Sequence, residues 1–151
     1  MLTDNYDKQL LYRRGNCKQK RGRYLKKIHD LCNLTENIDF IDLRESDAIL
    51  HNAKIPVWDE ATLTKSLTAE RVGEILRFVK EKYHHSFYVF IDHDWEFCGT
   101  FLLPSFEFVN DNFDFRIPNT ITDDIVFVSF NLGAHIHLEY EENNVNLYEY
   151  S

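Results

Sequence analysis

The stretch SFYVFIDHDWEFCGTFLL, residues 86–103, is the densest apolar run in the chain. Its alternating large side chains over 86–91 predict a strand, and the polar triplet at 92–94 predicts a turn. A second strand is expected over 95–102, and Pro104 ends it because proline cannot donate a backbone hydrogen bond. The stretch therefore predicts a central hairpin whose apolar side chains belong mainly to the core.

Two helical patterns precede this hairpin. Apolar residues recur at helical spacing over 4–34, where two interrupting glycines predict either two helices or one frayed helix. A clearer pattern covers 68–85, and the Thr68 hydroxyl is expected to cap its first N–H groups. Between the two patterns, alternation over 38–43 predicts a strand.

The C-terminal part of the chain is rich in strand signals. Alternating segments over 125–130, 134–141 and 145–150 are separated only by short turns, so these strands must pair antiparallel. The predicted fold class is α+β: a meandering antiparallel sheet of about five strands, with the N-terminal and central helices packed on one face. We expect the whole chain, residues 1–151, to form a single domain.

Composition bounds the location of the protein. The sequence has no uninterrupted apolar run of the roughly 18 residues that a membrane helix needs, and no secretory pattern at its start. Its three cysteines, Cys17, Cys32 and Cys98, are widely spaced and odd in number. They favour reduced thiols over a disulfide framework or a cysteine zinc site, so a cytoplasmic protein without a membrane segment is expected.

Charge is distributed very unevenly along the chain. Residues 1–35 hold nine Lys or Arg against three acids, whereas residues 92–151 hold one basic residue against twelve acids. Carboxylates interspersed with aromatic rings are typical of a surface that attracts a basic protein and then anchors it. An ordinary acidic surface is the simpler alternative. The candidate partner-binding residues are Asp92, Asp94, Trp95, Glu96, Asp111, Asp114, Asp123, Asp124, Glu139 and Glu141.

One pattern suggests a metal site instead. His135, His137 and Glu139 alternate along a predicted strand, so their side chains would share a face and offer ligands that zinc or iron accepts. The favoured interpretation is that this face meets solvent while Ile136 and Leu138 point inward. On that interpretation the protein needs no cofactor.

The basic segment over 13–27 suggests a third kind of function. Lys and Arg side chains beside Tyr24 on a helix are able to contact phosphates, which is how a nucleic-acid-binding regulator would use them. The net charge of −8 weakens this interpretation because the body of the protein repels nucleic acid. A solvated helix face is therefore favoured, and nucleic acid is not expected as a partner. Nucleophile elbows, phosphate loops and dinucleotide fingerprints are missing from the sequence.

A small, acidic, aromatic-rich α+β chain without a catalytic motif resembles the immunity proteins of bacterial contact-dependent inhibition and polymorphic-toxin systems. The resemblance extends over the whole chain and rests on its general type, so it carries over no residue roles. It implies a non-enzymatic inhibitor that covers a cognate basic toxin domain, typically a nuclease, with carboxylates. The basic segment at the start of the chain departs from a uniformly acidic inhibitor. The oligomeric state is not indicated.

Overall fold

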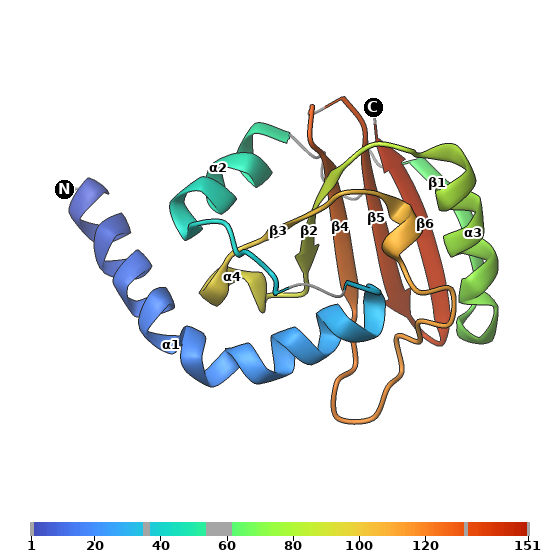
Figure 1. Ribbon diagram of the computed structural model, residues 1–151, viewed down its shortest axis with the longest axis horizontal. Coiled ribbons are helices and arrows are strands. Elements are labelled where there is room, and N and C mark those ends of the chain that lie inside the picture. The colour runs from blue at the N-terminus through green and yellow to red at the C-terminus, as the bar shows by residue number, and fades with distance from the viewer. Residues whose placement is uncertain (1, 35–36, 54–61, 132, 151) are drawn as a thin grey trace.

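A computed structural model describes residues 2–34, 37–53, 62–131 and 133–150. Helices lie against a six-stranded antiparallel sheet whose strand order is β1-β6-β5-β4-β2-β3 (Figure 1). The predicted α+β class is therefore confirmed, with six strands where about five were expected.

Four strands occupy the middle of the sheet. They are β2 (Phe87–Ile91), β4 (Asp124–Ser129), β5 (His135–Glu141) and β6 (Asn144–Tyr150). The strands β4, β5 and β6 form a meander, and β2 pairs with the outer side of β4. Each of the four lies within one residue of its predicted bounds, because short apolar-rich segments bounded by turn signals are typical of buried strands.

Two predicted strands are wrong. Trp95–Cys98 forms the short helix α4, so only Phe101–Leu103 of the second half of the hairpin joins the sheet, as β3. The chain turns at Gly99, whose φ of 101° is accessible mainly to glycine. Residues 37–42 form no strand. A backbone hydrogen bond from the Ile41 N–H to the carbonyl of Thr100, the residue before β3, is 2.8 Å long, and it does not extend into a ladder. Residues 37–42 lead instead into α2 (Leu43–Ala53).

The N-terminal pattern forms one continuous helix, α1 (Leu2–Leu31), so of the two predicted alternatives the one with two separate helices is wrong. Its C-terminal half crosses in front of the sheet, where Tyr24, Ile28 and Leu31 are fully buried, and its N-terminal half extends past α4 and α2 (Figure 1). Neither α1 nor any other helix in the described residues has the length and apolar character needed to cross a membrane.

The central helix follows an edge strand that the sequence did not reveal. This strand, β1 (Thr62–Thr68), pairs with β6, and the short 3-10 helix η2 (Ala69–Arg71) leads from it into α3 (Val72–Lys82). The Thr68 hydroxyl does not cap the helix, contrary to expectation. The buried face of α3 is nevertheless the predicted one: Val72, Ile75, Leu76 and Val79.

Aromatic rings fill the space between the sheet and the elements that cover it. Phe106, in the 3-10 helix η3 (Phe106–Phe108), lies 4.7 Å from the Phe87 ring and 4.9 Å from the Phe127 ring, between ring centroids. Tyr83, just after α3, meets the Phe87 ring edge-on at 5.9 Å. The high aromatic content of the chain is thus used largely in this core.

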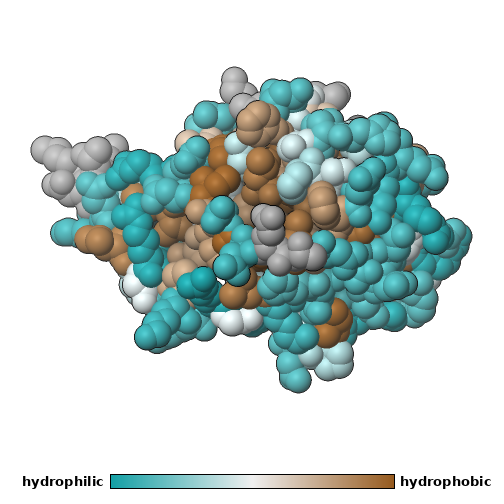
Figure 2. Space-filling model, in the orientation of Figure 1, coloured by the Kyte–Doolittle hydropathy of each residue, from teal (hydrophilic) through white to brown (hydrophobic). Residues whose placement is uncertain are grey.

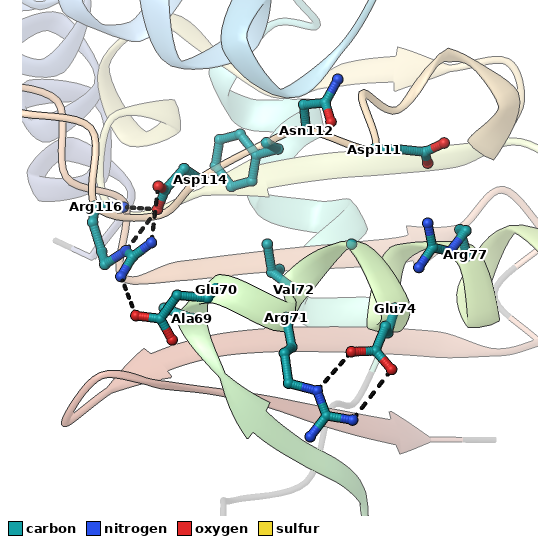
Figure 3. A pocket seen from close by; sticks show the side chains of 12 residues that line it. Ala69, Glu70, Arg71, Val72, Glu74, Arg77, Asp111, Asn112, Asp114 and Arg116 are labelled. Carbon is teal, nitrogen blue, oxygen red and sulfur yellow. Dashed lines mark hydrogen bonds and ion pairs between the residues drawn. The ribbon is translucent and has the colours of Figure 1, made fainter.

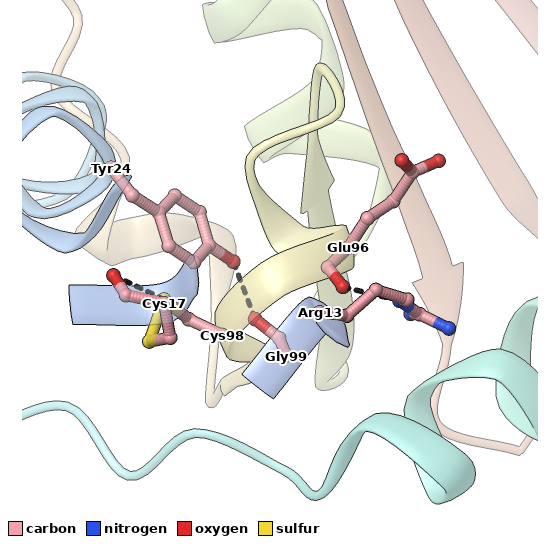
Figure 4. The surroundings of a disulfide bond; sticks show 6 residues. All are labelled: Arg13, Cys17, Tyr24, Glu96, Cys98 and Gly99. Carbon is pink, nitrogen blue, oxygen red and sulfur yellow. Dashed lines mark hydrogen bonds between the residues drawn. A yellow bond between two sulfur atoms is a disulfide. The ribbon is translucent and has the colours of Figure 1, made fainter. Parts of the chain in front are cut away.

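A disulfide joins α1 to α4, which overturns the expectation of reduced thiols. Cys17 and Cys98 are 81 residues apart in sequence, yet their Cα atoms are 5.0 Å apart and their sulfur atoms are bonded (Figure 4). The third cysteine, Cys32, is a free buried thiol, and burial raises its pKa to about 12. The sequence alone could not pair Cys17 with Cys98, because only the packing of α1 on α4 brings them together.

Candidate functional site

Four of the predicted partner-binding carboxylates lie together at one corner of the sheet, where β4 begins and β5 ends. We call this set the acidic corner; it consists of Asp123, Asp124, Glu139 and Glu141. Asp124 is directly opposite Glu139 in the β4–β5 pair, and the Tyr140 N–H donates to the Asp123 carbonyl at 2.7 Å. Asp123 and Glu141 are exposed to solvent, and Asp124 and Glu139 are partly exposed.

Like charges face each other across these two strands. Such a pair destabilises a sheet unless neighbouring groups compensate it. Here, His137 Nε2 lies 2.8 Å from Asp124 Oδ1, while Asn146 and Tyr148 donate hydrogen bonds to Glu139 Oε1 at 3.1 and 3.3 Å. The chain therefore supports two adjacent carboxylates with dedicated donors instead of separating them.

Asp92 forms hydrogen bonds with the backbone of the acidic corner. One of its carboxylate oxygens accepts the backbone N–H groups of Asp123 and Asp124, both at 2.9 Å, and its own N–H donates to the Asp124 carbonyl at 2.8 Å. Its φ of 47° is in the left-handed region, which Asp tolerates better than most residues. Asp92 was predicted to contact a partner, and the structure shows that it orders the two residues that start β4.

The other oxygen of Asp92 binds a buried lysine. Lys27 Nζ, on α1, is 2.6 Å from Asp92 Oδ2 and 3.1 Å from Asp94 Oδ2, and only 2% of the Lys27 side chain is exposed. A buried ammonium needs such partners because leaving water costs it several kcal/mol. Asp92 and Asp94 are therefore committed to an internal ion pair.

Asp123 lies close to other carboxylates of the corner. Burial raises the pKa of Asp123 above its usual value, and the charges of Asp92 and Asp124 raise it further, although Lys27 and Arg23 oppose them. The ionised form of Asp123 is thus disfavoured first by burial and then by the neighbouring charges of Asp92 and Asp124. A cationic group placed here would relieve the repulsion.

The remaining predicted residues of the 92–96 segment have structural contacts. The Trp95 ring is buried edge-on against Phe90 at 4.9 Å, and the Arg13 guanidinium lies 5.9 Å from its centroid. Glu96 is partly exposed, and His93 Nδ1 is 3.3 Å from its carboxylate. Trp95 is therefore not available as an exposed aromatic anchor.

Asp111 and Asp114 lie in a separate, charged cavity of about 370 Å³ between the start of α3 and the loop before β4 (Figure 3). Arg116 bridges Asp114 at 3.0 Å and Glu70 at 2.8 Å, and Lys80 binds Asp111 at 2.6 Å. These two carboxylates are paired within the protein.

The structure contradicts the favoured interpretation of the His135, His137 and Glu139 pattern as a face that meets solvent. His135 and His137 do not meet solvent, because both are buried, as are Ile136 and Leu138. The Ser129 N–H donates to His135 Nδ1 at 3.3 Å, and His137 contacts Asp124. Within the described part of the chain, no three His, Cys, Asp or Glu side chains are grouped to hold a metal ion.

The basic segment of α1 is divided between the interior and solvent. Arg13 forms two hydrogen bonds with Asp47, each 2.8 Å long, and Lys27 is buried, whereas Lys18, Arg21 and Arg23 are exposed.

An apolar groove of about 640 Å³ runs beside β3, lined by Ile38, Tyr88, Phe101, Leu102 and Phe108 among others. On the face shown in Figure 2, apolar side chains gather over β3, whereas α1 and α3 present mostly hydrophilic ones. The carboxylates of the corner and this groove are therefore different kinds of surface.

Lys27 is the residue of this site that the sequence analysis missed. Its position in the helical pattern was a usable signal, because it lies on the same face as Tyr24, Ile28 and Leu31. A lysine on a buried helix face predicts a carboxylate partner. The partner itself, 65 residues away, could not be identified without the fold.

Comparison of the chain with protein-family models, with curated proteins and with solved structures finds no match.

Proposed function

We propose that the protein is an immunity-type inhibitor that binds a basic toxin domain of the nuclease type through the acidic corner. The observation that carries the proposal is the facing pair Asp124 and Glu139, kept together by His137, Asn146 and Tyr148. Carboxylates organised in this way attract cationic groups over a distance and accept hydrogen bonds from guanidinium or ammonium groups on contact.

The proposal narrows the binding surface relative to the sequence prediction. Asp92 and Asp94 form ion pairs with Lys27, and Trp95 is buried. These three residues therefore have internal contacts and are no longer expected to touch the partner. Asp123, Asp124, Glu139 and Glu141 are the residues expected to meet the partner. Asp123 also loses repulsion when a cation arrives, which favours binding of a basic partner.

The proposed location is the cytoplasm, where an immunity protein would meet an incoming toxin domain. Disulfides are uncommon there, and those that occur are usually transient or redox-sensing. The Cys17–Cys98 bond is therefore expected to be reducible during the life of the protein.

The test is a charge reversal with a matched control. The probe is the C-terminal domain of the protein encoded by the gene directly upstream. The dissociation constant of its complex with this chain is measured by calorimetry at two salt concentrations. Asp124→Lys with Glu139→Lys is expected to weaken binding by at least about 100-fold. Glu81→Lys with Glu107→Lys changes the net charge equally at exposed positions outside the corner, so it is expected to leave affinity within about threefold. Undiminished affinity in the first variant would refute the surface, and a probe that does not bind the wild-type protein would refute the function.

A further inference from the structure

The segment 92–99 is fastened lengthwise along α1. Four side chains of α1, spaced over four turns, each hold one part of this segment. Three contacts are visible in Figure 4: Arg13 Nε to the Glu96 carbonyl at 2.5 Å, the Cys17–Cys98 disulfide, and the Tyr24 hydroxyl to the Gly99 carbonyl at 2.7 Å. The fourth is the ion pairing of Lys27 with Asp92 and Asp94. The disulfide is the only covalent fastener of the four.

The two halves of α1 are held with very different strength. From Tyr24 onward, the helix is anchored in the core by fully buried apolar side chains. Over residues 5–23, by contrast, Leu10 is the only buried side chain. We call residues 2–21 the arm. Besides Leu10, the arm depends on polar contacts, chiefly those of Arg13 with Asp47 and Glu96 and of Tyr6 with Asp47, and on the disulfide.

Glycines lie on both sides of Cys17. A Cβ atom added at Gly15 or Gly22 would meet nothing within 4 Å, so packing does not require glycine at either position. Glycine weakens a helix because it loses the most backbone freedom when it is ordered. Gly22 also marks the boundary between the arm and the anchored half, which is the place for a hinge.

We propose that the Cys17–Cys98 disulfide is a redox latch that holds the arm of α1 against α4, and that its reduction lets the arm pivot at Gly22. The reductant is a dithiol. One of its thiolates attacks a latch sulfur, the Cys17–Cys98 bond breaks, and its second thiol resolves the mixed disulfide. The dithiol leaves as a disulfide, and Cys17 and Cys98 each gain one hydrogen. Both cysteines are partly exposed, so the attacking sulfur has access.

Opening the latch changes one surface and preserves another. The Arg13 guanidinium lies 5.9 Å from the Trp95 ring centroid and Lys20 Nζ lies 5.3 Å from that of Phe97, so departure of the arm uncovers both rings. Tyr24 and Lys27 belong to the anchored half and keep their contacts with Gly99 and Asp92. The acidic corner therefore stays ordered in the reduced protein.

Hydrogen exchange followed by mass spectrometry tests the latch on the full chain, oxidised and after treatment with dithiothreitol. Reduction is expected to accelerate amide exchange over residues 8–21 at least about tenfold while residues 24–31 and β4–β6 stay protected. Cys17→Ser with Cys98→Ser should reproduce this pattern without reductant, and dithiothreitol should then have no further effect even though Cys32 is present. Gly22→Ala should reduce the acceleration.

Three results would overturn the proposal. The first is equal exchange of the arm in both redox states. The second is acceleration spread evenly over the helix and the sheet, since that describes a general stabilising crosslink. The third is alkylation of both Cys17 and Cys98 in protein purified without reductant from an oxidising compartment.

Discussion

Lys27 illustrates how one side chain connects the first helix to the candidate site. Its ammonium group binds Asp92, and Asp92 in turn binds the N–H groups of Asp123 and Asp124. A buried ion pair adds little net stability compared with a well-packed apolar group, but removing one partner leaves the other charge without compensation. Lys27 thus connects α1 to the acidic corner through Asp92, and its removal would leave the charges of Asp92 and Asp94 unpaired.

Lys27→Ala is therefore expected to lower the free energy of unfolding by about 3–5 kcal/mol, because Asp92 and Asp94 keep their charges in a largely buried place. The measurement is urea unfolding followed by circular dichroism. Lys26→Ala is the matched control: Lys26 is the neighbouring lysine, its side chain is 55% exposed, and it pairs with Asp30 across one helical turn. The control should cost less than about 0.5 kcal/mol. Similar losses in the two variants would contradict the role given to Lys27.

At the scale of single elements, replacing a glycine by alanine is expected to change the free energy of unfolding in opposite directions in α1 and in the turn between α4 and β3. Gly15→Ala and Gly22→Ala should each raise the free energy of unfolding by about 0.5–1 kcal/mol, since both positions are helical with open space around them. Gly99→Ala should lower it by at least about 2 kcal/mol, because the new Cβ would lie 2.0 Å from the Ile41 carbonyl oxygen at a φ of 101°. Urea midpoints measured on the oxidised protein distinguish these outcomes. A stabilising Gly99→Ala would contradict the positive φ and the close approach of Ile41 at this turn.

The sequence was sufficient for elements whose own pattern matches their burial. The helix α3 and the strands β2, β4, β5 and β6 carry a clear period, and they lie where that period places them. The strand β1 has no such period because Leu63 to Ser66 and Thr68 are exposed, and pairing with β6 makes it a strand. Alternation of Trp95 and Phe97 imitates a strand, yet packing against α1 makes this segment helical.

The candidate site was predicted in composition but not in organisation. Asp123, Asp124, Glu139 and Glu141 were identified as acidic residues of a surface, and the sheet brings them together. Which carboxylates are free and which are paired internally depends on contacts such as Lys27 with Asp92, and no local pattern contains that information.

For the molecule as a whole, buried His135 is expected to make the free energy of unfolding fall when the pH is lowered. Burial lowers its pKa below the usual 6.5, although a hydrogen bond to the Ala53 carbonyl opposes the shift. Below pH 6.5, His135 therefore binds a proton in the unfolded chain, whereas its buried imidazole stays neutral in the folded protein until the pH is lower. The stability that His135 contributes is complete above pH 6.5 and is lost progressively as the pH falls towards and through its lower, folded-state pKa.

His135→Gln, which cannot titrate, should consequently show a smaller fall in the free energy of unfolding between pH 7.5 and pH 5.5 than the wild-type protein. One such group contributes at most about 1.4 kcal/mol per pH unit. Urea unfolding at several pH values provides the comparison. His84→Gln is the control, because His84 is exposed, and it should retain the wild-type dependence. Parallel profiles for wild type and His135→Gln would contradict the buried neutral imidazole.

The position of β6 in the sheet has a consequence for how the protein is made. Although β6 follows the other described strands in sequence, it lies between β1 and β5, and Ser66 pairs with Asn146, 80 residues later. Until residues 144–150 join the sheet, β1 has no neighbouring strand and β5 is unpaired along one side. A folding intermediate that lacks β6 thus presents two open sheet edges, and such edges readily recruit other strands. Insertion of β6 is therefore the folding step at which a chaperone would protect this protein most.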